Sequence, residues 1–224
     1  MPQLHLLRVF CADDGSHGNP LGVFMDGSEV PPERRQAVAA DLGLSETVFV
    51  DDAERGEDRI FTPTDELDFA GHPSVGTAWL LEGAEALRPP AGETPVTREG
   101  EVVYVAARPE WGPSHELAEL RSPAEVEALD GPPEGHDLIA VWAWIDEPAG
   151  TMRARVFPVR IGIAEDEATG SAATKLCAMA GRAIDIRQGR GSRILARPAA
   201  DGLVEIGGRS TIDDVRDYTV PRES

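Results

Sequence analysis

The stretch that decides the fold is Phe69-Ala70-Gly71-His72-Pro73-Ser74-Val75-Gly76-Thr77-Ala78-Trp79-Leu80-Leu81, which follows a strand and turn beginning at Arg59. Residues 78–81 carry no charge on any face, so the stretch predicts a helix that is buried all round. The first amide groups of a helix have no partner inside it and point at whatever lies in front of it. A buried helix that opens on Gly71 and His72 is therefore a candidate anion site.

A second stretch, roughly 100 residues downstream, has the same construction. Residues 165–181 read Glu-Asp-Glu-Ala-Thr-Gly-Ser-Ala-Ala-Thr-Lys-Leu-Cys-Ala-Met-Ala-Gly, with Gly170 at the start of an alanine-rich helix and Gly181 at its end. This separation is too long for a solenoid repeat and suits two similar halves of one protein. Two such helices with facing amino ends can share one ligand. For either stretch alone, an ordinary helix cap is an equally good interpretation.

Composition excludes several classes of partner. The formal net charge of −19 over 224 residues argues against nucleic acid or an anionic membrane. It also disfavours long-range attraction of an anion, which local amides and dipoles would have to hold. Cys11 and Cys177 form no disulfide framework. Because the sequence has no bilayer-length apolar run and no leader, we expect a cytoplasmic protein with no membrane partner.

Neither a metal site nor a nucleotide loop is expected. Acidic Asp213 and Asp214 stand without clustered histidines or a regularly spaced acidic loop. The segment 188–192, Gln-Gly-Arg-Gly-Ser, lacks the lysine and the strand-to-helix context of a phosphate loop.

Hydrophobic patterns predict the remaining elements. Helices are expected at 31–42 and 123–129, and strands at 4–10, 21–25, 47–50, 184–188, 192–196 and 204–208. Hairpins are expected at 96–108, around Gly100, and at 137–157, where Trp142 and Trp144 share a core face. The break Pro-Glu-Trp-Gly-Pro at 109–113 is the best boundary between two halves.

Three polar residues stand out, each with an ordinary structural interpretation. Glu46 lies between the first helix and a buried strand, where a surface ion pair or a turn cap would explain it. His72 is consistent with a satisfied core histidine or a cap. Asp166 is consistent with an acidic residue that complements a helix dipole. From the residues alone, these interpretations stay open.

Four motifs in order resemble the PhzF family of phenazine biosynthesis-like proteins. They are Gly18-Asn19-Pro20-Leu21-Gly22-Val23-Phe24, Leu44-Ser45-Glu46-Thr47-Val48-Phe49-Val50, Phe61-Thr62-Pro63 with residues 69–76, and Glu165-Asp166-Glu167-Ala168-Thr169-Gly170-Ser171-Ala172. The resemblance implies an α+β fold like that of diaminopimelate epimerase. It implies two similar halves, 1–112 and 113–224, each with a mixed curled sheet around a central buried helix and with the active site between them.

The resemblance also implies a function. It predicts a cofactor-independent isomerase that moves a proton on a small carboxylate substrate, with Glu46 as general acid/base. His72 and Asp166 would orient substrate and proton, while Gly71, His72, Gly170 and Ser171 would bind the substrate. A homodimer is possible, as is common in the family.

The sequence departs from the family's usual motifs at two places, and two alternative functions stay open. Glu167 replaces the family's usual proline, and Pro73-Ser74 stands where many members have Ala-Thr. Neither helix start has the cysteine that diaminopimelate epimerase uses, so two-thiol epimerisation is disfavoured. One rival is a non-catalytic small-molecule binding protein that retains the family pocket. The other is amino-acid epimerisation, which would need a second acid/base on the opposite face.

Overall fold

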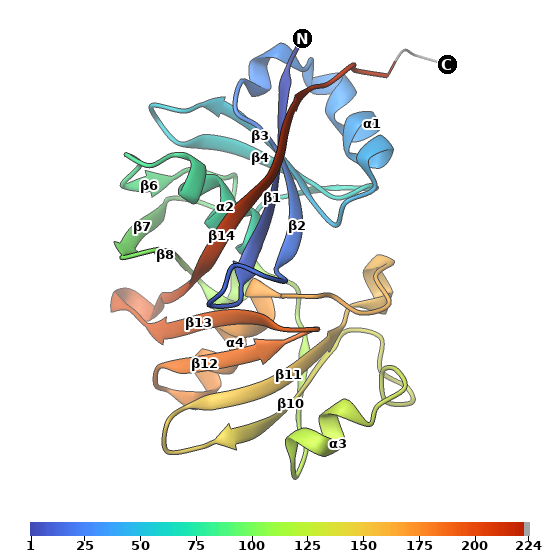
Figure 1. The fold of residues 1–224 in the computed structure, drawn as a ribbon, viewed down its shortest axis with the longest axis vertical. Coiled ribbons are helices and arrows are strands. Elements are labelled where there is room, and N and C mark those ends of the chain that lie inside the picture. The colour runs from blue at the N-terminus through green and yellow to red at the C-terminus, as the bar shows by residue number, and fades with distance from the viewer. Residues whose placement is uncertain (222–224) are drawn as a thin grey trace.

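One mixed sheet runs through both lobes of the molecule (Figure 1). The structure, a computed structural model, describes residues 1–221. Its strands are β1 Gln3–Cys11, β2 Asn19–Phe24, β3 Thr47–Asp52, β4 Glu57–Phe61, β5 Glu66–Leu67, β6 Ala86–Leu87, β7 Thr94–Glu99, β8 Val102–Ala107, β9 Glu116–Glu119, β10 Ile139–Asp146, β11 Thr151–Phe157, β12 Ile184–Gln188, β13 Ser192–Pro198 and β14 Val204–Asp217. The helices are α1 Pro32–Leu42, α2 Gly71–Leu80, α3 Pro123–Glu127 and α4 Gly170–Ala180, with 3-10 turns η1 Gly27–Glu29, η2 Pro109–Trp111, η3 Val159–Ile161 and η4 Ala200–Gly202.

Each lobe wraps its strands around one helix. Helix α2 is buried from Gly71 to Ala78 and packs on β1, β2, β8 and β14. Helix α4 is buried at seven positions and packs on β12, β13 and β14. The sheet is mixed because β2–β3, β9–β10 and β11–β12 pair in parallel and the other neighbours are antiparallel. The predicted α+β class is confirmed.

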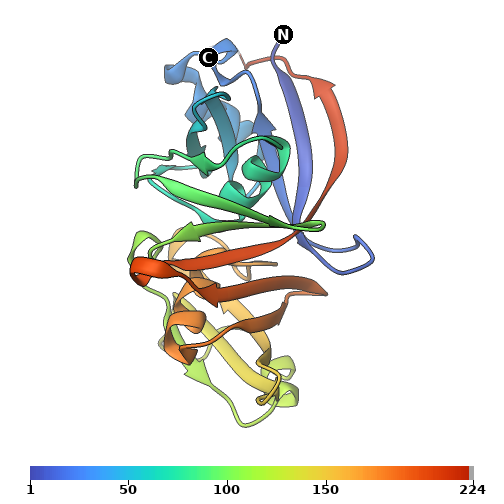
Figure 2. The ribbon, with the colours of Figure 1, turned by 90° about the vertical axis from the view of Figure 1, so that its left-hand side faces the viewer.

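Strand β14 connects the lobes. Its first part, residues 204–208, pairs with β8 and β13, and its second part pairs with β1 (Figure 2). The sequence predicts only residues 204–208 as strand. The extension was missed because residues 212–217 are exposed and mostly charged, and the pairing partner β1 is distant in sequence. The division of the chain at residue 112 stays a prediction.

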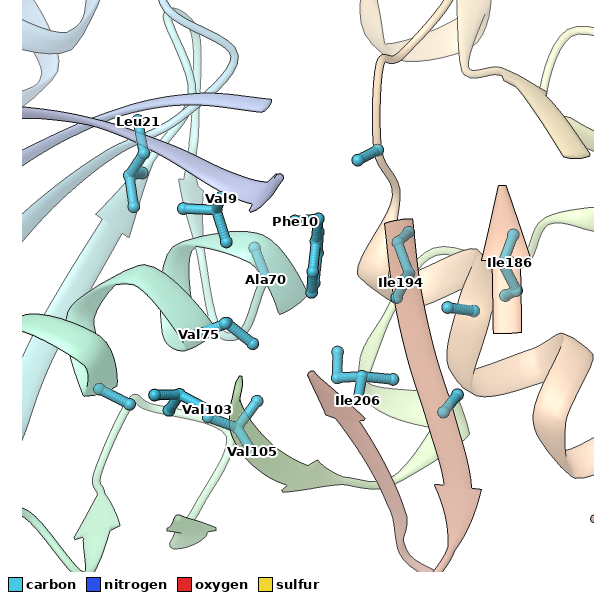
Figure 3. Close-up of a cluster of buried hydrophobic side chains, with 14 of the residues drawn as sticks. Val9, Phe10, Leu21, Ala70, Val75, Val103, Val105, Ile186, Ile194 and Ile206 are labelled. Atoms are coloured by element: carbon cyan, nitrogen blue, oxygen red, sulfur yellow. The ribbon is translucent and has the colours of Figure 1, made fainter. Parts of the chain in front are cut away.

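The main apolar core is continuous across the lobes. Ile206 of β14 and Ile194 of β13 share one cluster with Val9 of β1 and Val75 of α2 (Figure 3). The predicted hairpins are present as β7–β8 and β10–β11. Within residues 1–221, no helix has the length and apolar character needed to cross a membrane.

Candidate active site

The amino ends of α2 and α4 open into one cavity of about 740 Å³. Gly71 and His72 line it from α2, and Gly170 and Ser171 line it from α4. The prediction that two buried helices face each other with their amino ends is confirmed by this shared lining.

The two helix starts are in direct backbone contact. A Cβ atom added to Gly71 would lie 2.7 Å from the Gly170 Cα atom, and a Cβ atom on Gly170 would lie 2.7 Å from the Gly71 Cα atom. Either added Cβ would also meet Ile206 Cδ1 within 3 Å. Only glycine permits this approach, because any side chain at either position collides with backbone.

Neither helix start has a side-chain cap. In the part of the chain that the structure describes, the N-cap residues Ala70 and Thr169 make no side-chain hydrogen bond to the first turn. The Thr169 hydroxyl instead donates to the Asp166 carboxylate, at 2.6 Å. First-turn amide groups at both helix starts are therefore left for a ligand in the cavity.

Glu46 lies just before β3, with its side chain 14% exposed. Its Oε2 atom is 3.5 Å from His72 Nε2, yet both atoms are buried and neither makes a hydrogen bond to any residue from 1 to 221. Burial raises the pKa of the Glu46 carboxyl to about 7. A carboxyl with that pKa exchanges its proton readily near neutral pH.

Asp166 lies beside the same pair and is held by two donors. Asn19 Nδ2 donates to Asp166 Oδ1 at 2.8 Å, and the Thr169 hydroxyl donates to Oδ2. Burial, with the nearby Glu46 carboxyl, raises the pKa of Asp166 to about 6. Burial lowers the pKa of His72 to about 4, so its imidazole is neutral at pH 7. The predicted proximity of Glu46, His72 and Asp166 is confirmed; their roles stay predictions.

The sequence did not mark Asn19 and His115 as functional residues, although both belong to the site. Asn19 lies in a quoted family motif, at the start of β2, and its buried side-chain amide donates to Asp166 Oδ1 and to the Ala168 carbonyl oxygen, both in the loop before α4. His115 places Nε2 3.1 Å from Ser171 Oγ. No local pattern marks His115, because it meets Ser171 only through the fold.

The aromatic wall of the cavity was also missed. Phe69 and Trp111 both line the cavity, with ring centroids 5.5 Å apart. They come from the residue preceding the N-cap of α2 and from η2, so only the folded chain brings them together.

Glu167 is turned away from this cavity. Its Oε1 accepts hydrogen bonds from the Arg190 amide and the Ser192 hydroxyl, at 3.0 and 2.8 Å. The carboxylate of Glu167 therefore lies at the turn between β12 and β13, outside the cavity.

Both cysteines are buried away from the cavity lining. Among residues 1–221, no group of three or more His, Cys, Asp or Glu side chains is arranged to hold a metal ion.

Comparison with known proteins gives the family. Residues 8–128 match the model of the phenazine biosynthesis-like (PhzC-PhzF) family. The chain is 33% identical to a trans-2,3-dihydro-3-hydroxyanthranilate isomerase of Pseudomonas aeruginosa, over 88% of this chain and 92% of that protein. The chain belongs to the PhzF family. Several relatives of this PhzF-family protein are named isomerases, including one of Pasteurella multocida, and the chain is an isomerase.

Solved structures agree with the fold. The PhzF-family protein superposes on a Bacillus anthracis phenazine biosynthesis protein of the same family with a TM-score of 0.81 and 17% identity, covering 98% of this chain and 99% of that one. A PhzC/PhzF protein of Clostridium difficile gives a TM-score of 0.79 and 21% identity, covering 98% and 100%. At these identities, the likeness bears on the fold alone.

Proposed function

We propose that this protein isomerises a small carboxylate substrate by moving one proton, with Glu46 as the acid/base and no cofactor. The observation that carries the proposal is the position of Glu46. Its carboxyl is buried at the shared mouth of two uncapped helices, where its pKa is raised to about 7. General acid/base catalysis is most effective when the pKa of the group lies near the working pH.

The substrate carboxylate would bind between the helix starts. Backbone amides of Gly71 and Gly170, with the Ser171 hydroxyl, supply the donors, and two helix dipoles favour negative charge there. Such local binding fits a chain of net charge −19, which cannot attract an anion over long distances.

Glu46 alone would carry the proton, with His72 and Asp166 assisting beside it. Ionised Glu46 takes a proton from a substrate carbon, and the neutral acid returns it to another atom on the same face. Neutral His72, 3.5 Å from Glu46, can accept or donate a hydrogen bond to the reacting group. Asp166, pinned by Asn19 and Thr169, orients the substrate. A proton shift on one face needs one acid/base, whereas epimerisation needs a second on the opposite face.

The proposed substrate class is supported by the substrate named for the relative and by the aromatic side chains that line the cavity. A six-membered ring such as that of trans-2,3-dihydro-3-hydroxyanthranilate, named for the Pseudomonas aeruginosa relative, would lie against Phe69 and Trp111. Its carboxylate would then reach the helix starts. We use this compound as the test substrate and anthranilate as its stable analogue.

The test separates binding from turnover. Anthranilate affinity is measured by calorimetry, and conversion of trans-2,3-dihydro-3-hydroxyanthranilate is followed by absorbance, for the wild type, Glu46→Gln and Glu66→Gln. Glu66 lines the same cavity but is exposed and paired with Arg59, so it is a matched control. We expect turnover to fall at least about 100-fold in Glu46→Gln alone, with affinity within about threefold of wild type. Binding without turnover by the wild type would favour the non-catalytic binding protein instead.

A further inference from the structure

His115 is a buried polar side chain of the cavity with no place in the proton shift. It immediately precedes β9 and is 7% exposed. Its Nε2 atom lies 3.1 Å from Ser171 Oγ, and no other partner of that oxygen is found in the part of the chain that the structure describes. Its Nδ1 atom is buried and, among the described residues, makes no hydrogen bond.

The backbone fixes this contact. A Cβ atom on Gly112 would lie 2.5 Å from Ser171 Cβ, so the segment before β9 packs directly on the first turn of α4. The His115 amide donates to the Pro113 carbonyl oxygen at 2.9 Å. The backbones that carry His115 and Ser171 are therefore held close to each other.

The imidazole is neutral at pH 7. Burial lowers the pKa of His115 to about 4, and the charge of Lys175, four residues after Ser171 on α4, acts in the same direction. A neutral imidazole carries one proton, and its tautomer is set by the hydrogen bonds that the two nitrogens make. An N–H group at Nδ1 would be buried with no acceptor, which costs more than an unused lone pair there. The proton therefore belongs on Nε2, facing Ser171.

We propose that His115 is a positioning residue of the carboxylate site: its Nε2–H group donates to Ser171 Oγ and so directs the serine proton toward the substrate carboxylate. This inference rests on the proposed carboxylate site. It deepens that proposal because the serine would otherwise be free to donate to the histidine, leaving only lone pairs to face an anion.

The tautomer is tested in the unmodified protein. Long-range proton–nitrogen NMR correlation at pH 7 distinguishes a protonated from a bare Nε2, and His115→Gln assigns the signal. A proton on Nε2 supports the assignment. A bare Nε2, which can only accept the serine proton, overturns it.

Binding gives the second test. For His115→Leu we expect anthranilate to bind about 10- to 100-fold more weakly, while 2-aminobenzamide, which lacks the carboxylate, changes by less than about threefold. His115→Gln, whose amide can donate from a similar position, should recover much of the affinity. In a Ser171→Ala background, His115→Leu should cause no further loss. His136→Leu, at a partly exposed histidine outside the cavity that pairs with Glu116, is the control.

Failure of this inference is distinguishable from failure of the proposed function. Equal anthranilate affinity in wild type and His115→Leu would overturn the positioning role even if Glu46-dependent turnover is found. Absence of turnover, with the affinity pattern as expected, would leave His115 in its role and remove the proton shift.

Discussion

Gly71 and Gly170 bring the backbones of two helices into contact, and this contact builds the site. With hydrogen alone at both positions, the amino ends of α2 and α4 open into the same cavity. A chain with a larger residue at either position would have to separate the two lobes or shift one helix.

Substitution of either glycine by alanine is expected to destabilise the fold. The new methyl group meets the opposite backbone at 2.7 Å, so we expect Gly71→Ala and Gly170→Ala each to lower the free energy of unfolding by about 1–3 kcal/mol or more. The double variant should lose less free energy of unfolding than the two single variants lose together, because the first substitution already separates the helices. Urea unfolding measures this. Gly83→Ala, where an added Cβ meets nothing within 4 Å, is the control, and equal stabilities of Gly83→Ala and Gly71→Ala would contradict the contact.

Asn19→Ala should release Asp166. The variant loses the hydrogen bonds from Asn19 to Asp166 and to the Ala168 carbonyl oxygen, so we expect a stability loss of about 1–3 kcal/mol and a kcat about 10- to 100-fold lower. The pKa of Asp166 should also rise, since Asn19 is one of the donors that lower it. Carboxyl carbon NMR and steady-state kinetics measure these effects. A variant with normal kcat would show that Asn19 only holds the lobes together.

The two carboxyls of the site should respond to each other. Because the Glu46 charge helps raise the pKa of Asp166 to about 6, Glu46→Gln should lower the Asp166 pKa. Carboxyl carbon NMR titration of wild type and Glu46→Gln measures this shift, and an Asp166 pKa that is the same in both proteins would contradict the arrangement.

The burial of Asp58 predicts that the free energy of unfolding depends on pH, independently of the candidate active site. It lies in β4, 2% exposed, and neither carboxyl oxygen has a hydrogen-bond partner within residues 1–221. Burial, with a contribution from the Asp51 charge, raises its pKa from 3.8 to about 7. The folded state therefore binds the proton more tightly than the unfolded state, and stability is lost as pH rises from about 4 to 7.

The test is the stability of Asp58→Asn relative to wild type. Relative to this variant, the wild type should lose on the order of a few kcal/mol between pH 4 and 8. Urea unfolding at several pH values measures the difference, with Asp214→Asn at an exposed position as control. Parallel pH profiles for wild type and Asp58→Asn would rule out a buried charge at this position.

Much of the fold was predictable from local pattern. The glycine that opens each central helix, the apolar residues 78–81 and the alternation in 137–157 are features that a short window contains. The second part of β14 was not predictable in this way, because its charged residues adopt strand conformation only by pairing with β1.

The same distinction, between features of a short sequence window and contacts made only by the fold, holds for the residues of the site. Glu46, His72 and Asp166 were found because family motifs mark them. His115 and Trp111 were not, because their partners Ser171 and Phe69 are distant in sequence and meet them only in the folded chain. The raised pKa of Glu46 comes from the burial of its side chain, which only the folded chain supplies.

The most direct test of the account is the fate of the moved proton. Trans-2,3-dihydro-3-hydroxyanthranilate is incubated with the wild type and with Glu46→Gln in D₂O, and deuterium in the product is located by mass spectrometry and NMR. We predict at most one deuteron, at a single carbon, for the wild type, and no product for Glu46→Gln despite normal anthranilate affinity. Isomerisation by Glu46→Gln at the wild-type rate would contradict the central role of this glutamate.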